Sequence, residues 1–203
     1  MRRNGEVLAR YDNLLTRVVD RRDAIQQFDD FLRKETAWLT APASTQLHLA
    51  EEGGLLEHSV NVATTLLLLR DALAPDIPTE SCVIVGLYHD PGKVGVPGKP
   101  YYLPNPSQWH VHNRGIRYIV NNDVVHLDIA TRSLYLIAQH VPLTDDEAQA
   151  IRFHDGKYIP KNQSVAHREV QLTRLVQYAD TWAAGVLEAR VPESSGARRI
   201  AAI

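Results

Sequence analysis

The sequence predicts an all-α protein, a helical bundle with one short β-hairpin inserted into it. Apolar residues recur at helical spacing over most of the chain, one short stretch is β-prone, and prolines or glycines separate the segments. The chain has 203 residues, of which 44% are hydrophobic and 23% charged, enough for one substantial core. We expect a single domain over residues 1–190, with a helical extension at about 1–40, and a flexible tail at 191–203.

Two helical regions are expected in the first third of the chain. Over residues 11–39, apolar positions follow helical spacing and arginine and aspartate fill the other face, which predicts one long or two short amphipathic helices. After a break, Gly53-Gly54 precede a helical run that extends to about Leu73. His58 therefore lies in the first turns of that run.

The next segment contains the most informative polar pair. Thr79 is a suitable N-cap, and an apolar run leads from it into His89-Asp90, after which Pro91-Gly92 should end the helix. A buried strand could show the same apolar run, but its polar ending and its helical surroundings favour a helix. The prolines at 97, 100, 104 and 106 then predict an irregular loop, a candidate lid.

The β-hairpin is expected directly after this loop. Residues 108–112 and 116–120 form two short β-prone runs around a turn at 113–115. His110 and His112 would then share one face of a strand, where simple exposure is favoured over metal or substrate binding. Helical spacing returns at 130–140, at 144–153 and from about 168 to 187.

The pair His89-Asp90 raises the question of a metal site. Charged residues are rarely buried without a partner, so an aspartate at the inner end of an apolar helix needs a compensating cation. A metal ion explains both residues, whereas a His–Asp hydrogen bond that caps the helix is the alternative. His58 and Asp180 lie in two other apolar segments. Each has an ordinary structural explanation alone, but together they favour a metal centre between three helices.

The residues around these positions resemble the signature of the HD-domain phosphohydrolase superfamily. The resemblance is carried by Gly53-Gly54-Leu55-Leu56-Glu57-His58-Ser59 and by Leu87-Tyr88-His89-Asp90-Pro91-Gly92-Lys93. It extends over about residues 41–187, because residues 143–154 also resemble a helix of HD proteins from phage and bacterial genomes. The resemblance implies an HD-domain helical bundle whose metal ligands are His58, His89, Asp90 and Asp180.

Several positions bear on a second metal ion. Family members that bind two ions use additional histidines, and the best match here is His154. Phage relatives carry a Gly-His-Gly-Glu-Lys-Ser segment where this chain has residues 128–133, so Ile129 stands in place of a histidine. His126 and His140 lie near this position in the sequence, and either could substitute for the absent histidine, although the resemblance points to neither. The chain could therefore hold one ion or two. His48 also resembles a position in these relatives, and it could face the site or lie in a surface loop.

The ligand types suit several divalent ions and one reaction class. A mixed imidazole and carboxylate shell fits Mn, Fe, Co, Ni or Zn, and with more water also Mg. Asp90 would orient the attacking water, and Lys93 would neutralise developing charge. His154 would bind a second ion, contact phosphate or protonate the leaving oxygen. The resemblance implies a metal-dependent phosphohydrolase, a phosphomonoesterase or phosphodiesterase, whose small phosphate-ester substrate derives from a nucleotide or nucleic acid.

Two other functions stay open. The absent histidine allows a metal-binding regulatory or interaction module with little or no turnover. A nuclease that acts on nucleic-acid ends would need an aromatic or basic track beside the metal. Residues that could stack bases there are Tyr101, Tyr102, Trp109 and Tyr118, although scattered aromatic residues are more often packing residues.

Composition limits the expected partners. The formal net charge is -2, from 22 basic and 24 acidic residues, so long duplex nucleic acid is not expected to bind through a global basic field. Cys82 is the only cysteine and allows no internal disulfide. The N-terminus lacks a secretory apolar region and no run of 18 apolar residues occurs, so we expect a cytoplasmic protein without a membrane partner. The sequence leaves the oligomeric state open.

Overall fold

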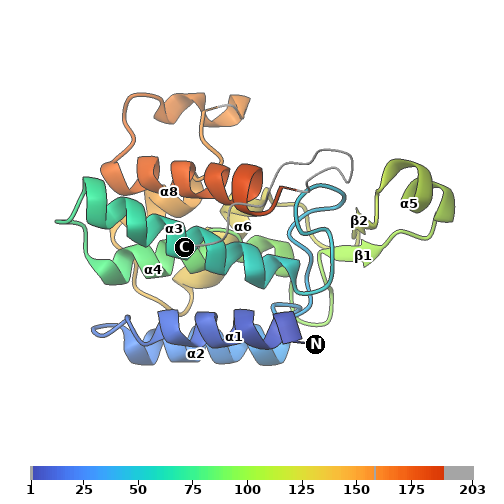
Figure 1. The fold of residues 1–203 in the computed structure, drawn as a ribbon, viewed down its shortest axis with the longest axis horizontal. Coiled ribbons are helices and arrows are strands. Elements are labelled where there is room, and N and C mark those ends of the chain that lie inside the picture. Colours follow the sequence, from blue (N-terminus) through green and yellow to red (C-terminus); the bar gives the residue numbers. More distant parts are fainter. Residues whose placement is uncertain (1, 158, 190–203) are drawn as a thin grey trace.

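The computed structural model describes residues 2–157 and 159–189 and confirms the all-α class with one short β-hairpin (Figure 1). Its α-helices are α1 (Arg2–Leu15), α2 (Arg22–Glu35), α3 (Gly54–Leu73), α4 (Thr79–Tyr88), α5 (Gln108–Arg114), α6 (Ile129–Ala138), α7 (Asp145–Arg152) and α8 (Gln171–Trp182). The other helical segments are the 3-10 helices η1 (Pro91–Val94) and η2 (Pro160–Val165) and the π-helical η3 (Ala183–Leu187). Strands β1 (Tyr102–Pro104) and β2 (Tyr118–Val120) pair antiparallel.

Helix α3 lies in the middle of the bundle, between α1 on one side and α8 on the other (Figure 1). It buries most of its circumference, as an apolar central helix should. Helix α4 packs beside it, and its residues from Ser81 to Tyr88 are all buried. The two backbones approach closely because α4 has Gly86 where a Cβ would lie 2.5 Å from the Cα of Ala63. This contact brings the ligand-bearing ends of α3 and α4 together.

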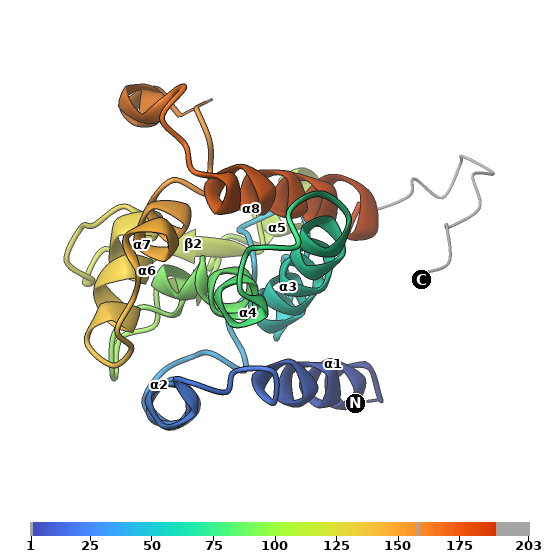
Figure 2. The same ribbon diagram turned by 90° about the vertical axis from the view of Figure 1, so that its left-hand side faces the viewer.

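The N-terminal region forms two helices, and they make one layer of the bundle on the side away from α8 (Figure 2). Helix α1 begins at Arg2, earlier than the apolar pattern predicts. Arg21, in the turn between the helices, donates to Glu147 of α7 at 2.6 and 2.7 Å and to Glu80 of α4 at 2.6 Å. These hydrogen bonds fix the N-terminal layer to the rest of the bundle.

The expected first strand at 108–112 is wrong. These residues form α5, and the strand that pairs with β2 is β1, within the segment expected to be an irregular loop. Local caps explain the helix, because the hydroxyl oxygen of Ser107 accepts from the N–H of His110 and Gly115 ends the helix at a φ of 66°. His110 and His112 are therefore exposed on a short helix and do not share the face of a strand.

The later helices lie where helical spacing predicts them. Helix α7 begins with a capping box, in which the Thr144 hydroxyl accepts from the N–H of Glu147 and the Glu147 carboxylate accepts from the N–H of Thr144. Helix α8 continues into η3, so helical structure reaches Leu187. The expected tail at 191–203 falls outside the described residues. Within the described ranges, no helix combines the length and apolar character needed to cross a membrane.

Candidate metal centre

The four sequence-predicted ligands come from three parts of the bundle and meet at one place. His58 lies in the second turn of α3, His89 and Asp90 directly follow α4, and Asp180 lies in α8. One ligand atom from each of His58, His89 and Asp90 lies within 4.8 Å of the others. The same holds for His89, His154 and Asp180, so His154, which follows α7, lies with the predicted ligands.

One local device orients both His89 and His154. The ring nitrogen Nδ1 of His89 donates to the carbonyl oxygen of Gly86 at 2.9 Å, and Nδ1 of His154 donates to that of Ile151 at 2.9 Å. A carbonyl oxygen only accepts, so Nδ1 carries a proton in both rings. In a neutral ring Nε2 then has the free lone pair, which is how a metal-binding histidine is held by its surroundings.

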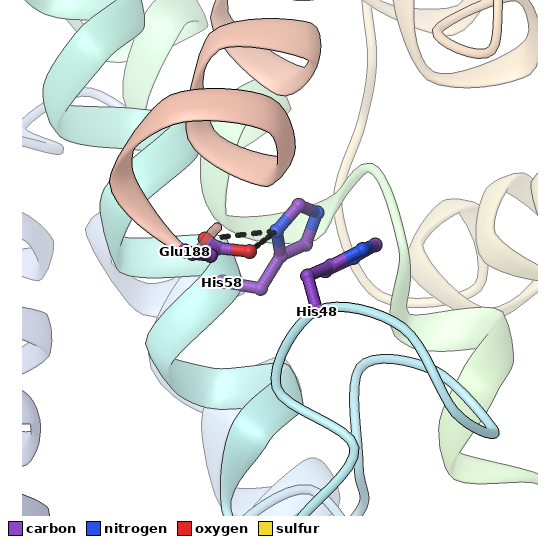
Figure 3. Close-up of side chains that lie close together, drawn as sticks. All are labelled: His48, His58 and Glu188. Atoms are coloured by element: carbon purple, nitrogen blue, oxygen red, sulfur yellow. Dashed lines mark hydrogen bonds and ion pairs between the residues drawn. The ribbon is translucent and has the colours of Figure 1, made fainter. Parts of the chain in front are cut away.

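Two carboxylates hold His58, one at each ring nitrogen. Nε2 lies 3.1 Å from Oδ1 of Asp180, and Nδ1 lies 3.0 and 3.1 Å from the carboxylate oxygens of Glu188 (Figure 3). Burial lowers the pKa of His58, but the hydrogen bonds to Asp180 and Glu188 outweigh it and raise the pKa to about 9. The ring is an imidazolium at neutral pH, and a divalent ion at Nε2 would replace that proton.

The spacing of the donor atoms fits one divalent ion. Nε2 of His58 and Nε2 of His89 are 3.3 Å apart. Two nitrogens bound to one ion at about 2.1 Å, at a tetrahedral or octahedral angle, are roughly 3.0–3.4 Å apart. Burial lowers the pKa of His89 to about 4, so this ring is neutral at pH 7 and offers a lone pair. These buried imidazoles and carboxylates could hold a metal ion.

Asp90 is the carboxylate that the surrounding groups share. Its Oδ1 lies 3.4 Å from Nε2 of His154, and its Oδ2 lies 3.6 Å from Nε2 of His89. Nζ of Lys93 also forms an ion pair with Oδ2. Burial raises the pKa of Asp90, but the positive charge of Lys93 and the imidazoles hold that pKa well below its usual range. The carboxylate is therefore ionised, as a metal ligand must be.

The turn after Asp90 places Lys93 at this carboxylate. The N–H of Gly92, in η1, donates to the hydroxyl oxygen of Ser133 at 2.9 Å. A Cβ at Gly92 would collide with the carbonyl oxygen of Ile129 at the start of α6. The glycine of the sequence motif is therefore required by the close packing of η1 on α6, and this packing directs Lys93 toward the centre.

Glu188 is a site residue that sequence reasoning missed. It is buried, with 8% of its surface exposed, and it accepts hydrogen bonds from His58 and from Nδ2 of Asn61, the latter at 3.1 Å. It directly follows η3, and π-helical turns of this kind are frequent at functional sites. In the sequence Glu188 looks like a solvent-facing charge at the end of the last apolar stretch. The one signal is its position about two helical turns after Asp180.

His48 reaches the site from the loop before α3 (Figure 3). Its ring centroid lies 5.0 Å from that of His58, and His48, His58 and Glu188 have ligand atoms within 4.8 Å of one another. The side chain is half-buried, and burial lowers its pKa. His48 therefore faces the site and could contact a substrate or a second ion.

No histidine of the described residues takes the place of the one that Ile129 replaces. His126 is exposed, and His140 stacks on Phe31 of α2 with ring centroids 4.9 Å apart. Within residues 2–157 and 159–189, no close group of metal-ligating side chains includes His110, His112, His126 or His140. A second ion would depend on His48 or His154.

Comparisons of the chain with family models, with curated proteins and with solved structures gave no match. The chemistry of the site and the sequence motifs therefore indicate the function. Its imidazole nitrogens and carboxylate oxygens are donor types that divalent transition-metal ions prefer, and Asp180, with 23% of its side chain exposed, is the most exposed of the four predicted ligands. The site therefore combines buried donor groups with one partly exposed carboxylate.

Proposed function

We propose that this protein is a metal-dependent phosphohydrolase of the HD type, a phosphomonoesterase or phosphodiesterase that acts on a phosphate ester of nucleotide or nucleic-acid origin. The observation that carries the proposal is the convergence of His58, His89, Asp90 and Asp180 at one centre, with a lysine beside it. The resemblance of residues 53–59 and 87–93 to the HD signature supports the same reaction class.

The four converging residues would hold the ion. When bound, a divalent ion would polarise a phosphate oxygen and lower the pKa of a water molecule toward neutrality. The mixture of nitrogen and oxygen donors suits Mn, Fe, Co, Ni or Zn, and Mg with more water ligands. Glu188 would keep a proton on Nδ1 of His58 and so keep Nε2 directed at the centre.

Lys93 and His154 would supply charge and a proton. The ammonium of Lys93 lies at Oδ2 of Asp90, from which it could turn to phosphate oxygens and neutralise the charge that develops on them. Burial lowers the pKa of His154, but the interaction with Asp90 outweighs it and raises the pKa to about 9. His154 is therefore protonated at neutral pH, and its Nε2–H could donate to the leaving oxygen.

The test measures metal content and hydrolysis together. Stripped protein is reloaded with each candidate ion and assayed on p-nitrophenyl phosphate, bis(p-nitrophenyl) phosphate, nucleoside mono- and triphosphates and cyclic dinucleotides. We expect at least one ion per chain and restored turnover with one of the metals. His89→Ala and Asp90→Ala should lose both properties, whereas His126→Ala, at an exposed histidine outside the site, should keep both. Ligand variants that retain metal and activity would contradict the proposal.

A metal-binding regulatory or interaction module is the second candidate. The observation that favours it is Ile129, which stands where the resemblance implies a histidine and which no described histidine replaces. Such a module needs the ligands for folding or for signalling but not a complete catalytic shell. Stoichiometric metal binding without hydrolysis of any of these substrates would select this function over the first.

A further inference from the structure

The segment that leaves the metal centre is basic, although the whole chain is slightly acidic. Residues 95–122 contain Lys99, Arg114 and Arg117, two histidines and no acidic residue, whereas the chain has 24 acidic residues in all. All three cations are exposed. Within the described residues, none of them forms an ion pair with a carboxylate. We call residues 95–122, which comprise β1, α5 and β2, the basic arm.

The basic arm projects from one end of the bundle, with α5 at its far end (Figure 1). Helix α5 has no buried residue, so packing within the described structure does not account for it. Trp109 on this helix is 56% exposed, and the guanidinium of Arg114 lies 5.6 Å from the centroid of its indole ring. An exposed aromatic ring beside a cation is the combination on which unpaired bases stack.

The base of the arm adjoins the metal centre on two sides. The arm starts just after η1, whose Lys93 pairs with Asp90. Tyr102 in β1 interacts electrostatically with both Lys93 and Asp90. Burial and the charge of Asp90 raise the pKa of Tyr102 to about 12, while Lys93 opposes them. On the other side, the N–H of Arg117 donates at 3.0 Å to the carbonyl oxygen of Thr45, in the loop that carries His48.

We propose that the basic arm binds single-stranded nucleic acid and leads one end of the strand to the metal centre. Lys99, Arg114 and Arg117 would contact phosphates, and Trp109 would stack on a base. A duplex hides the faces of its bases, and three cations neutralise few of its phosphates, so a single strand fits better. The role of the strand's end rests on the proposed function, whereas the binding itself does not.

The charges that face the arm limit the path of the strand. Glu51 and Glu52, in the loop before α3, act on Tyr118 and raise its pKa together with burial, while Arg117 opposes them. Phosphates would therefore avoid the Tyr118 side of the ribbon. The remaining path passes over α5, where Trp109 and Arg114 lie, and then past Arg117 and Lys99 toward Lys93.

The test is fluorescence anisotropy with the full chain and a fluorescein-labelled 12-mer of oligo-dT with phosphorothioate linkages, checked intact by gel afterwards. Trp109→Ala should weaken binding by about fivefold or more, the lower range for loss of one stacked base. Arg114→Gln combined with Arg117→Gln should reduce the slope of log K against log salt by about 1.4. Tyr135→Ala and Arg22→Gln, at exposed positions on α6 and α2, should change neither quantity.

The possible outcomes separate the two proposals. Weaker binding in the arm variants alone, with a duplex of the same length competing poorly, supports the proposal. Unchanged affinity in those variants overturns it, and so does a result in which Trp109→Ala only dissociates a dimer in sedimentation. A protein that binds the oligonucleotide but hydrolyses no phosphate ester would refute the proposed function and leave the role of the arm supported. Hydrolysis without oligonucleotide binding would support the proposed function and refute the role of the arm.

Discussion

Two adjacent residues, Tyr88 and His89, belong to two different buried polar clusters. In the first, which we call the tyrosine cluster, the Tyr11 hydroxyl lies 2.7 Å from Oδ1 of Asp29 and 2.8 Å from the Tyr88 hydroxyl. The carboxylate only accepts, so Tyr11 donates to Asp29 and Tyr88 donates to Tyr11. Nε of Arg33 completes the set by donating to Asp29 at 2.8 Å. Every donor in this chain of hydrogen bonds has an acceptor.

The candidate metal centre is also mostly buried, but its hydrogen-bond donors and acceptors are balanced differently. Its imidazoles and carboxylates converge on one another, and the ammonium of Lys93 lies among them. With neutral imidazoles the acceptor atoms would exceed the donors, and the raised pKa values of His58 and His154 supply the missing protons and positive charge. Buried polar groups therefore do not by themselves indicate a metal site, whereas converging groups that need added protons to balance their charges make this cluster the candidate.

The largest expected difference between the clusters is in metal binding. Asp90→Ala should abolish bound metal and lower kcat/KM for phosphate esters by at least about 100-fold, beyond what an outer-shell change causes. Asp29→Ala should leave the metal content of the folded fraction unchanged, because no ligand is touched. Elemental analysis and hydrolysis assays check this. Metal loss in Asp29→Ala, in protein with native circular dichroism, would break the distinction.

A smaller effect is expected at Glu188. Glu188→Gln keeps an acceptor for Nδ1 of His58 but removes the charge, so metal affinity should fall by about 10–100-fold while stoichiometry at saturation stays the same. Isothermal titration with the candidate metal measures both quantities. Glu35→Gln, at the exposed end of α2, is the matched control. Equal affinities in wild type and Glu188→Gln would mean that this carboxylate only stabilises the fold.

The tyrosine cluster should affect stability alone. Tyr11→Phe removes the acceptor of the buried Tyr88 hydroxyl and one of the donors to Asp29, which keeps its bond from Arg33, and this should lower the free energy of unfolding by about 1–3 kcal/mol. Tyr135→Phe, at an exposed position, should change it very little. Urea denaturation gives the difference, and metal titration should show the same affinity in both variants. A change in metal affinity in Tyr11→Phe would mean that the two clusters are coupled through α4.

The pH dependence should also separate the clusters. Because the pKa values of His58 and His154 are raised to about 9, the folded metal-free chain holds more protons than the unfolded chain above about pH 6.5. Their contribution to stability is complete below pH 6.5 and is lost as the pH rises through 9. Metal affinity should rise over the same interval, since protons leave the ligands. Urea denaturation and metal titration at pH 6.5–9 measure the two opposite trends, and Tyr11→Phe should keep both.

The four predicted ligands could be found from the sequence because each interrupts an apolar stretch, and a polar group in such a stretch is a local signal. Glu188 could not be found that way, because its burial depends on the π-helical turn before it and on where α3 lies. Whether His140 could replace the absent histidine could not be decided from the sequence either. The ring packs on aromatic residues of α2, a contact that no spacing reveals.

In the basic arm, hydrophobic periodicity does not predict the secondary structure. Periodicity reports which residues a helix or strand buries, and α5 buries none, so the alternation of His110 and His112 around Val111 indicated a strand that does not exist. The cap at Ser107 and the glycine at 115 were the better signals. Helices α3 and α4 were predicted well because nearly everything about them is decided by burial.

The contact between Gly86 and Ala63 has a consequence for ion selectivity. It sets the separation of two backbones, and through them the 3.3 Å between the ligand nitrogens of His58 and His89. An ion about 2.1 Å from both nitrogens would span them at an angle of roughly 104°, between octahedral and tetrahedral geometry. Gly86→Ala, if it folds, would widen this separation and should weaken the binding of ions with such short ligand distances, without altering a single ligand.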